Sequence, residues 1–292
     1  MIRRVFALAL AVALGACGGE GARGDLPPPS PALWEVTRPD GRAAGWLFGT
    51  IHALPAGTAW RTPAIDRAIV STDMLVVEVA DLDDRGKLAA TFTRMAHSDG
   101  LPPLSGRVPG GMRERLAALL AKGNYREADF RAIETWGAAI MLSRLADESS
   151  GGNGVDRALV TALEGRPIVE LEGIEGQFAI FDGLPESDQR DLLGAVVGED
   201  TMDTDDSARL ARLWLAGDME AIAREADEGM LADPGLREAL LTRRNRAWVE
   251  RLAAIYASGK RPLVAVGAAH MAPPSGLPEL LAARGYTVTR VR

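Results

Sequence analysis

The 292-residue chain is poor in the residues that usually reveal function: it has one cysteine, Cys17, and three histidines, His52, His97 and His270. A single cysteine excludes an intramolecular disulfide. There is no Gly-x-Ser-x-Gly, P-loop or His-Glu-x-x-His motif, which argues against a nucleophile-elbow hydrolase, an NTPase and a zincin. Aromatic residues make up 5% and interleave with no basic cluster, so no nucleic-acid partner is expected.

The N-terminal segment has the pattern of an export signal. Arg3 and Arg4 precede a short apolar run, Val5–Ala13, which is too short to span a bilayer. The run closes on Leu14-Gly15-Ala16-Cys17, which resembles the lipobox of bacterial lipoproteins. We therefore expect a signal peptide over residues 1–16 and a lipid on the cysteine. The alternative is an ordinary cleavable signal in which the cysteine is incidental.

A tether and one large domain are expected after the signal. Residues 17–31 are rich in glycine and proline, as flexible linkers are. Gly18 is not acidic, which by resemblance to lipoprotein sorting favours the outer membrane of a Gram-negative cell, facing the periplasm. The domain is expected over residues 32–292. Loss of Arg3 and Arg4 with the signal moves the formal charge from −7 to −9.

Short apolar runs alternate with segments of helical period. Strands are expected at Leu33–Thr37, Gly45–Thr50, Met74–Val79, Pro167–Glu172, Leu263–Val266 and Tyr286–Val291. Helical segments are expected at 63–70, about 84–147, 177–258 and 277–284. This alternation predicts an α/β fold with a central, mainly parallel sheet flanked by helices, in which a long helical middle region covers one face.

Two of the three histidines follow an apolar run that ends in Gly-x-x-His. These corners are Gly49-Thr50-Ile51-His52 and Gly267-Ala268-Ala269-His270, more than 200 residues apart. Glycine at a strand end permits a tight turn or the close approach of another group. Imidazole is the commonest metal ligand and the commonest general base. If the fold brings the two corners together, they form a metal or catalytic site.

Glu78 is the carboxylate in the most unusual setting, because it follows Val76 and Val77 in an apolar run. A charge there is costly unless it is paired, hydrogen-bonded or bound to a metal. The alternative is a salt bridge on a solvated strand end. A metal site in this chain has to combine both histidine corners with at least one carboxylate, and that donor set suits zinc, manganese or cobalt.

A cluster of four polar residues, Arg243 to Arg246, lies in a helical pattern just before the second corner. One interpretation is a solvated helix face whose partners include Glu238 and Glu250. The other directs an arginine and Asn245 towards a carbonyl oxygen or a carboxylate.

Three further polar residues are expected at the ends of strands or helices or on the surface. Glu172 is expected at the carboxyl end of the third parallel strand, where ligands collect. Glu175 is explained by an ordinary helix start. His97 is expected to be a surface or helix-capping residue.

The order of these motifs resembles the TraB/GumN family across the whole domain. The resemblance is carried by Leu33-Trp34-Glu35-Val36, Gly49-Thr50-Ile51-His52, Val77-Glu78, Gly154-Val155-Asp156, Leu171-Glu172 with Gln177, Arg244-Asn245, Val266-Gly267-Ala268-Ala269-His270 and 280–288. That family is similar to the Tiki metalloproteases, and the related fold is shared in outline with erythromycin esterase and the haem-binding ChaN lipoproteins.

The resemblance implies roles for individual residues. His52 and His270 would bind a divalent metal, with Glu78 as a ligand or general base. Arg244 and Asn245 would orient substrate or stabilise an oxyanion. Glu172, Gln177 and Asp156 are secondary candidates from the matching motifs. The chain departs from the family where Gly173 replaces a common threonine, which is expected to loosen local hydrogen bonding, and where Ala269 replaces a glycine, which should only constrain the turn.

The resemblance implies a lipid-anchored, metal-dependent hydrolase of the cell envelope that acts on peptides or peptide-like bonds. Two alternatives stay open. The first is a protein that binds a peptide or haem without turnover, in which the same histidines ligate haem iron. The second is a scaffold lipoprotein whose motif residues have lost their activity.

Overall fold

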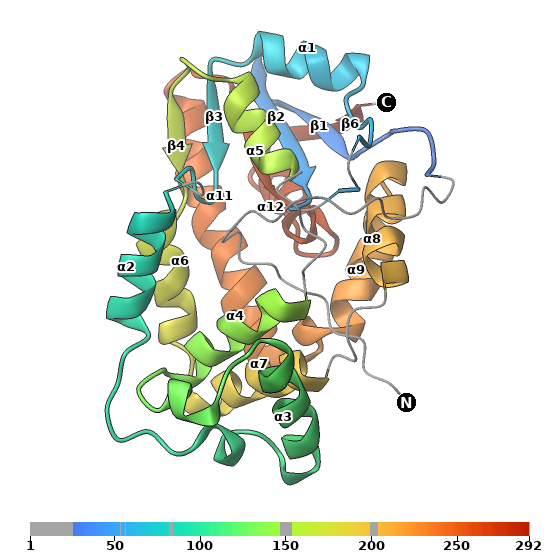
Figure 1. The fold of residues 1–292 in the computed structure, drawn as a ribbon. Helices are drawn as coiled ribbons and strands as arrows, with labels where there is room; N and C mark the ends of the chain where they lie inside the picture. The colour runs from blue at the N-terminus through green and yellow to red at the C-terminus, as the bar shows by residue number, and fades with distance from the viewer. Residues whose placement is uncertain are drawn as a thin grey trace.

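The computed structural model describes residues 26–52, 54–55, 57–81, 84–146, 154–198 and 204–291. The expected signal peptide, Cys17, Gly18 and most of the tether lie outside these residues. The described chain forms one six-stranded sheet with helices around it (Figure 1). Its strands are β1 (Leu33–Thr37), β2 (Ala43–Thr50), β3 (Met74–Val77), β4 (Ile168–Glu170), β5 (Pro262–Gly267) and β6 (Thr287–Val291).

Helices separate the strands everywhere except between β1 and β2, which a turn connects. Thr62 caps the first helix by accepting the N–H of Ile65, and Pro63 occupies its first turn. The α-helices are α1 (Pro63–Ser71), α2 (Arg85–Met95), α3 (Arg113–Lys122), α4 (Thr135–Ala146), α5 (Val155–Ala162), α6 (Gly173–Asp182), α7 (Glu186–Gly198), α8 (Thr204–Ala216), α9 (Met219–Glu228), α10 (Pro234–Arg237), α11 (Arg243–Ala257) and α12 (Leu277–Ala283).

The expected mainly parallel sheet is confirmed. The strand order is β4-β3-β5-β2-β1-β6, in which the β4–β3, β3–β5 and β5–β2 pairs are parallel and β1 is antiparallel to both of its neighbours. In the β2–β5 pair, Gly49 lies opposite Val266 and Thr50 opposite Gly267. The two Gly-x-x-His corners therefore leave neighbouring strands at the same edge of the sheet.

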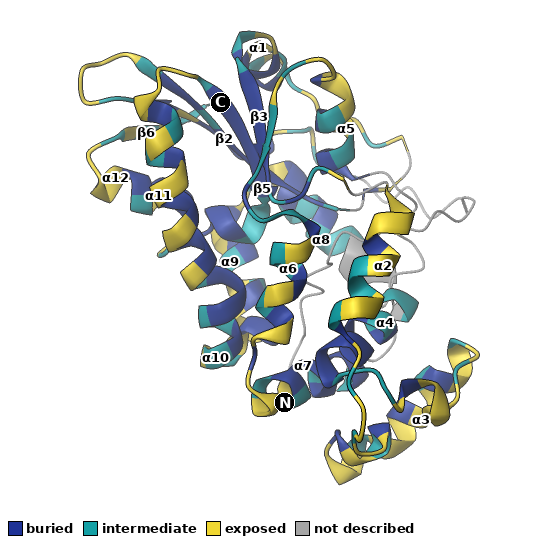
Figure 2. Cartoon of the chain, turned by 90° about the vertical axis from the view of Figure 1, so that its left-hand side faces the viewer, coloured by how far each residue is buried: buried dark blue, intermediate teal, exposed yellow. Residues whose placement is uncertain are grey.

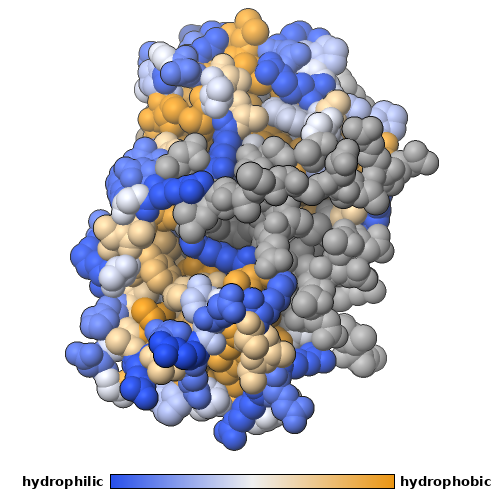
Figure 3. Space-filling view, in the orientation of Figure 1, coloured by the Kyte–Doolittle hydropathy of each residue, from blue (hydrophilic) through white to orange (hydrophobic). Residues whose placement is uncertain are grey.

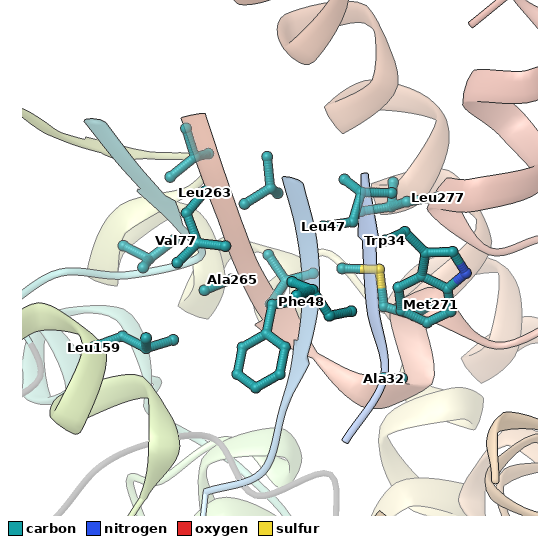
Figure 4. Close-up of a cluster of buried hydrophobic side chains, with 14 of the residues drawn as sticks. Ala32, Trp34, Leu47, Phe48, Val77, Leu159, Leu263, Ala265, Met271 and Leu277 are labelled. Atoms are coloured by element: carbon teal, nitrogen blue, oxygen red, sulfur yellow. The ribbon is translucent and has the colours of Figure 1, made fainter. Parts of the chain in front are cut away.

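The sheet and the helices that cover it share one hydrophobic cluster, which we call the sheet cluster. Helix α5 lies on one face of the sheet, and α11 and α12 lie on the other (Figures 1 and 2). Leu47, Phe48, Leu263 and Ala265 are almost fully buried between them (Figure 4). Strand β3 is buried along its whole length, as an interior strand of a parallel sheet should be.

The remaining helices form a second cluster, which we call the helical cluster. It lies beyond the ends of the β2 and β3 arrows in Figure 1 and is built mainly from α2, α3, α4, α6, α7 and α10. Trp136, Phe178 and Leu193 are buried at its centre. Both long helical stretches of the sequence contribute to it, so the middle region forms a separate core and does not simply cover one face of the sheet.

Several elements differ from the sequence expectation, and three of these differences concern the candidate residues. Strand β3 ends at Val77, so Glu78 is the first residue after the strand. Strand β4 ends at Glu170, and Glu172 precedes α6, which begins at Gly173 and not at residue 177. A π-helical turn, Glu238–Thr242, directly precedes α11, so the helix that carries the polar cluster is irregular there.

Within the described part of the chain, no helix has both the length and the apolar character that a membrane crossing needs. On the face seen in Figure 3, hydrophilic and apolar side chains are interspersed over the residues that are described.

Candidate functional site

The first histidine corner packs closely on the second at Gly49. A Cβ built on Gly49 would lie 3.1 Å from the Cα of Ala268, which is tighter than an ordinary contact. A Cβ on Gly267 would lie 3.4 Å from Oε1 of Glu78 and 3.8 Å from Cδ2 of His270. The glycines therefore allow the close approach that the motif predicts, and they place Glu78 beside the second corner.

The side chain of Glu78 is only 15% exposed and receives several hydrogen bonds. Its Oε1 accepts the Gly267 N–H at 2.9 Å, and its Oε2 accepts from Arg244 Nη2 at 2.5 Å and from Gln177 Nε2 at 3.2 Å. These bonds exclude the solvated salt bridge as the explanation of Glu78. They also bring Gln177 into the site, as the sequence motif indicates.

Part of the polar cluster on α11 is a solvated helix face, and part of it points into the site. Arg243 and Arg246 are 72% and 66% exposed and lie near Glu238. Arg244 is 7% exposed and bonds Glu78, Glu172 and the Leu240 carbonyl. Glu250, the other expected partner, pairs with Arg284 instead.

Asn245 fixes the orientation of His270, and both side chains are buried. The Asn245 amide donates from Nδ2 to the Ser275 carbonyl at 2.9 Å, which turns its Oδ1 towards His270 Nδ1 at 2.6 Å. An amide oxygen only accepts, so Nδ1 carries the proton and Nε2 of the neutral ring keeps a lone pair. Trp248 packs on the same ring, with centroids 4.3 Å apart.

His52 is held by a carboxylate, that of Asp156, and not by an amide. Its Nδ1 lies 3.0 Å from Oδ2 of Asp156, whose Oδ1 accepts from Thr50 Oγ1 at 2.5 Å. The start of α5 is anchored to this corner as well, because the Val155 N–H donates to the Ile51 carbonyl. The His52 side chain is 32% exposed, whereas His270 is almost completely buried.

Burial and the central guanidinium set the protonation of the site. Burial would raise the pKa of Glu78, but Arg244, followed by His270, lowers it to about 2. Burial raises the pKa of Glu172, and the bonds from Arg244 offset this only in part. The two carboxyls differ because Glu78 also receives the Gly267 N–H and Gln177. Burial, and then the Arg244 charge, lower the pKa of His270 to about 3, so its ring is neutral at pH 7.

Two residues of the site were not identified in the sequence. Trp248 donates from Nε1 to Glu172 at 3.0 Å, and the Arg244 guanidinium lies 4.7 Å above its ring. Its position four residues after Arg244, on the same helix face, is a signal that a helical projection makes visible. Thr50 lies inside the first Gly-x-x-His motif, at a position that the motif leaves unspecified.

The remaining sequence candidates add no side chain to this cluster. His97 forms an isolated bridge with Ile133 and its side chain is 55% exposed, as expected for a surface residue. Glu175 is exposed and pairs with Arg94. Gly173 has φ +70°, which favours glycine, and its N–H donates to the Glu78 carbonyl. The expected loosening at this position is therefore absent from the backbone.

The donor chemistry of the site suits a divalent ion. Two imidazoles have their Nδ1 atoms occupied by neighbours, which is the usual arrangement of metal-ligating histidines. The site holds three carboxylates and one guanidinium: Glu78 and Glu172 bond Arg244, whereas Asp156 bonds His52, so these four side chains carry a formal charge of −2. As the side chains stand, no three His, Cys, Asp or Glu residues of the described chain are grouped closely enough to hold an ion.

Comparison with known proteins places this arrangement in a family. The sequence profile of the TraB/PrgY/gumN family matches residues 32–290. The chain belongs to this family. The match covers both Gly-x-x-His corners, Glu78 and the Arg244-Asn245 pair, so the whole site lies within the shared region.

Two curated relatives are similar over most of their length. The uncharacterized protein YbaP of Shigella flexneri is 26% identical over 259 residues, which cover 86% of this chain and 92% of the relative. The uncharacterized protein YbaP of Escherichia coli K12 gives the same identity and coverage. No solved structure gives a significant match.

Proposed function

We propose that this TraB/PrgY/gumN family member is a divalent-metal-dependent hydrolase of the cell envelope, acting on peptides or peptide-like bonds. The observation that carries the proposal is the meeting of the two Gly-x-x-His corners on adjacent parallel strands beside Glu78. His52, His270 and Glu78 would hold the ion, which would be manganese, cobalt or zinc. When bound, such an ion lowers the pKa of a coordinated water and polarises a carbonyl.

The protonation states of the site support this proposal. Metal binding needs neutral imidazole and ionised carboxylate. The lowered pKa values of His270 and Glu78 keep both groups in those forms at neutral pH. The formal charge of −2 on the four central side chains also favours a divalent cation.

Arg244 and Asn245 act in this proposal through their neighbours. Arg244 holds the Glu78 carboxylate in place while Glu172 and Trp248 hold the arginine. Asn245 presents His270 with a fixed tautomer. Because Arg244 and Asn245 are buried, their assignment is positioning of the donors and not contact with an oxyanion.

Metal content and thermal stability test the proposal directly. The full-length chain is measured with manganese, cobalt and zinc beside a His52→Ala/His270→Ala double variant. Because a ligand that binds only the native state raises stability by RT ln(1 + [L]/Kd), a 100-fold excess over Kd adds about 2.7 kcal/mol. We expect a rise in Tm that the double variant loses and that a His97→Ala control keeps. An equal rise in all three proteins would refute the site.

We propose that Cys17 carries the lipid anchor and places the domain in the outer membrane, facing the periplasm. The motif at residues 14–17 supports this proposal. The test is fractionation of cells that express the wild type or Cys17→Ser. We expect the wild type in the membrane fraction with a lipid-labelled band, and the variant without the label. Labelling of the variant would exclude this anchor.

The proposed relation to the erythromycin esterase and ChaN folds rests on the sequence resemblance together with the mainly parallel sheet between helices. A crystal structure of the domain, superposed on both folds, tests it; a different strand order in those folds would exclude the relation.

A further inference from the structure

We propose that Thr50 and Asp156 form a positioning pair, which orients the His52 imidazole and keeps the proton of the neutral ring on Nδ1. The inference deepens the proposed function and rests on it where it concerns metal affinity. The tautomer itself is a property of the metal-free protein.

The pair is built from two elements that lie far apart in the sequence. Thr50 is the last residue of β2 and is 2% exposed, whereas Asp156 is the second residue of α5 and is 9% exposed. The backbone bond from the Val155 N–H to the Ile51 carbonyl locks the helix start onto the strand end. Strand and helix therefore hold both side chains at fixed positions beside His52.

The direction of each hydrogen bond follows from the donors present. The Thr50 hydroxyl has one proton and gives it to Oδ1 of Asp156 at 2.5 Å. The carboxylate is thereby turned so that Oδ2 faces His52 Nδ1 at 3.0 Å. A carboxylate oxygen accepts, so the imidazole donates its Nδ1 proton, and in the neutral ring this is the only N–H proton.

The close packing at Gly154 shows that this geometry is built into the backbone. A Cβ at Gly154 would lie 2.5 Å from the His52 carbonyl oxygen, so only glycine lets α5 begin close enough for Asp156 to reach the imidazole. At the other corner, the amide of Asn245 binds Nδ1 of His270 as the carboxylate of Asp156 binds Nδ1 of His52. Each histidine thus has its own partner, and each partner comes from a helix that packs on the corner.

A merely structural role for Thr50 and Asp156, as a link between β2 and α5, predicts lower stability and no change in the tautomer. Nuclear magnetic resonance of the imidazole nitrogens separates the two roles. The chain has only three histidines, so the His52 signals are assigned by their loss in His52→Ala. Spectra are recorded on the metal-free, full-length protein at a pH high enough for the His52 ring to be neutral.

We expect the wild-type His52 to carry its proton on Nδ1. Asp156→Asn should lose the single tautomer, because an amide both donates and accepts. Thr50→Val should lose the single tautomer in part, while Thr50→Ser, which keeps the hydroxyl, should give the wild-type spectrum. Thr72→Val is the matched control, because Thr72 is a buried hydroxyl that bonds the Met74 and Arg261 carbonyls.

Two spectroscopic results would overturn the inference. The first is a wild-type His52 that is protonated on Nε2. The second is a tautomer that stays unchanged in Asp156→Asn and Thr50→Val, or that changes equally in Thr72→Val.

Cobalt affinity separates this inference from the proposed function. Loss of a residue that orients a metal ligand typically weakens binding about 10–100-fold, and we expect a fall of this size in Asp156→Asn, a smaller one in Thr50→Val and none in Thr72→Val. If the wild type binds no metal while its tautomer still follows the variants, the proposed function fails and the positioning pair stands. If the wild type binds cobalt and the variants bind it equally well, the positioning pair fails and the metal site stands.

Discussion

At the scale of single residues, the site is organised around one buried guanidinium. Arg244 satisfies Glu78 and Glu172 together, and Trp248 supports both Arg244 and His270. Removing one partner of a buried ion pair is far more costly than removing an exposed one, because the partner that remains is left desolvated and unpaired.

Arg244→Met should therefore lower the free energy of unfolding by about 3–5 kcal/mol. The adjacent Arg243→Met is the matched control; because Arg243 is 72% exposed, it should change stability by no more than about 0.5 kcal/mol. Adding Glu78→Gln and Glu172→Gln to Arg244→Met should recover much of the loss, since the stranded charges are gone. Urea denaturation measures all four proteins. Equal stability of the two single variants would contradict the central role of Arg244.

The buried imidazole of His270 predicts a pH dependence. Its folded-state pKa of about 3 lies below the unfolded value of about 6.5, so the unfolded chain binds the proton more readily. The stability this provides is complete above pH 6.5 and is lost as the pH falls towards 3. One proton corresponds to a slope of about 1.4 kcal/mol per pH unit.

We expect the metal-free wild type to lose stability as the pH falls from 6.5, with a slope that approaches this value near pH 5, measured by urea denaturation in a chelator. His270→Gln should remove this contribution, and His97→Gln, at an exposed position, should keep it. A slope that persists unchanged in His270→Gln would show that another group titrates.

At the scale of secondary-structure elements, the sequence predicts well what depends on local pattern. The apolar runs give the six strands, and strand–helix alternation gives the parallel pairs around β5. Glu78 stands out because a carboxylate follows Val77 in a buried run. The sequence does not predict the β2–β5 register, which joins residues more than 200 positions apart.

The division of the polar cluster on α11 follows the period of the helix. Arg244 and Asn245 precede the buried Trp248 and Val249 by four residues and share their face, whereas Arg243 and Arg246 face solvent. The π-helical turn at Glu238–Thr242, which directly precedes these residues, is what a pattern of regular period does not predict.

The contact between α5 and the first corner gives a prediction at the element scale. Gly154→Ala should cost about 1–3 kcal/mol, because the new methyl group would lie 2.5 Å from the His52 carbonyl oxygen and something has to move. Gly111→Ala is the control, since a Cβ there meets nothing within 4 Å. Thermal unfolding of both variants is the measurement. Equal Tm values would mean that the start of α5 adjusts without strain.

At the scale of the whole molecule, the site lies where the chain passes between the two hydrophobic clusters. Val77 belongs to the sheet cluster and Val79 to the helical cluster, with Glu78 between them. Leu171 and Ile174 flank Glu172 in the same way. Figure 2 shows α11 running from the sheet towards the helical part, and it carries Arg244 at that junction. A change in the packing of either cluster therefore reaches the site.

Because the helix from Pro234 to Ala257 places Leu240 in the helical cluster and Leu252 in the sheet cluster, we expect the two clusters to unfold together. Leu142→Ala in the helical cluster and Leu252→Ala in the sheet cluster should each cost about 2–5 kcal/mol. Val70→Ala, at a position that is 74% exposed, is the control.

Hydrogen exchange followed by mass spectrometry distinguishes joint from separate unfolding. For a single cooperative unit, Leu142→Ala should speed exchange of the slowest amides in β3 and β5 as much as those in α4 and α7, because all of them open only when the whole domain unfolds. Faster exchange confined to α4 and α7 would mean that the helical cluster opens alone. The site would then lose the packing on one side while the sheet stayed folded, and Arg244 would be released from Glu78 without global unfolding. The long helix that spans both clusters argues for the cooperative outcome, since opening the helical cluster alone would require that helix to break at its π-helical turn.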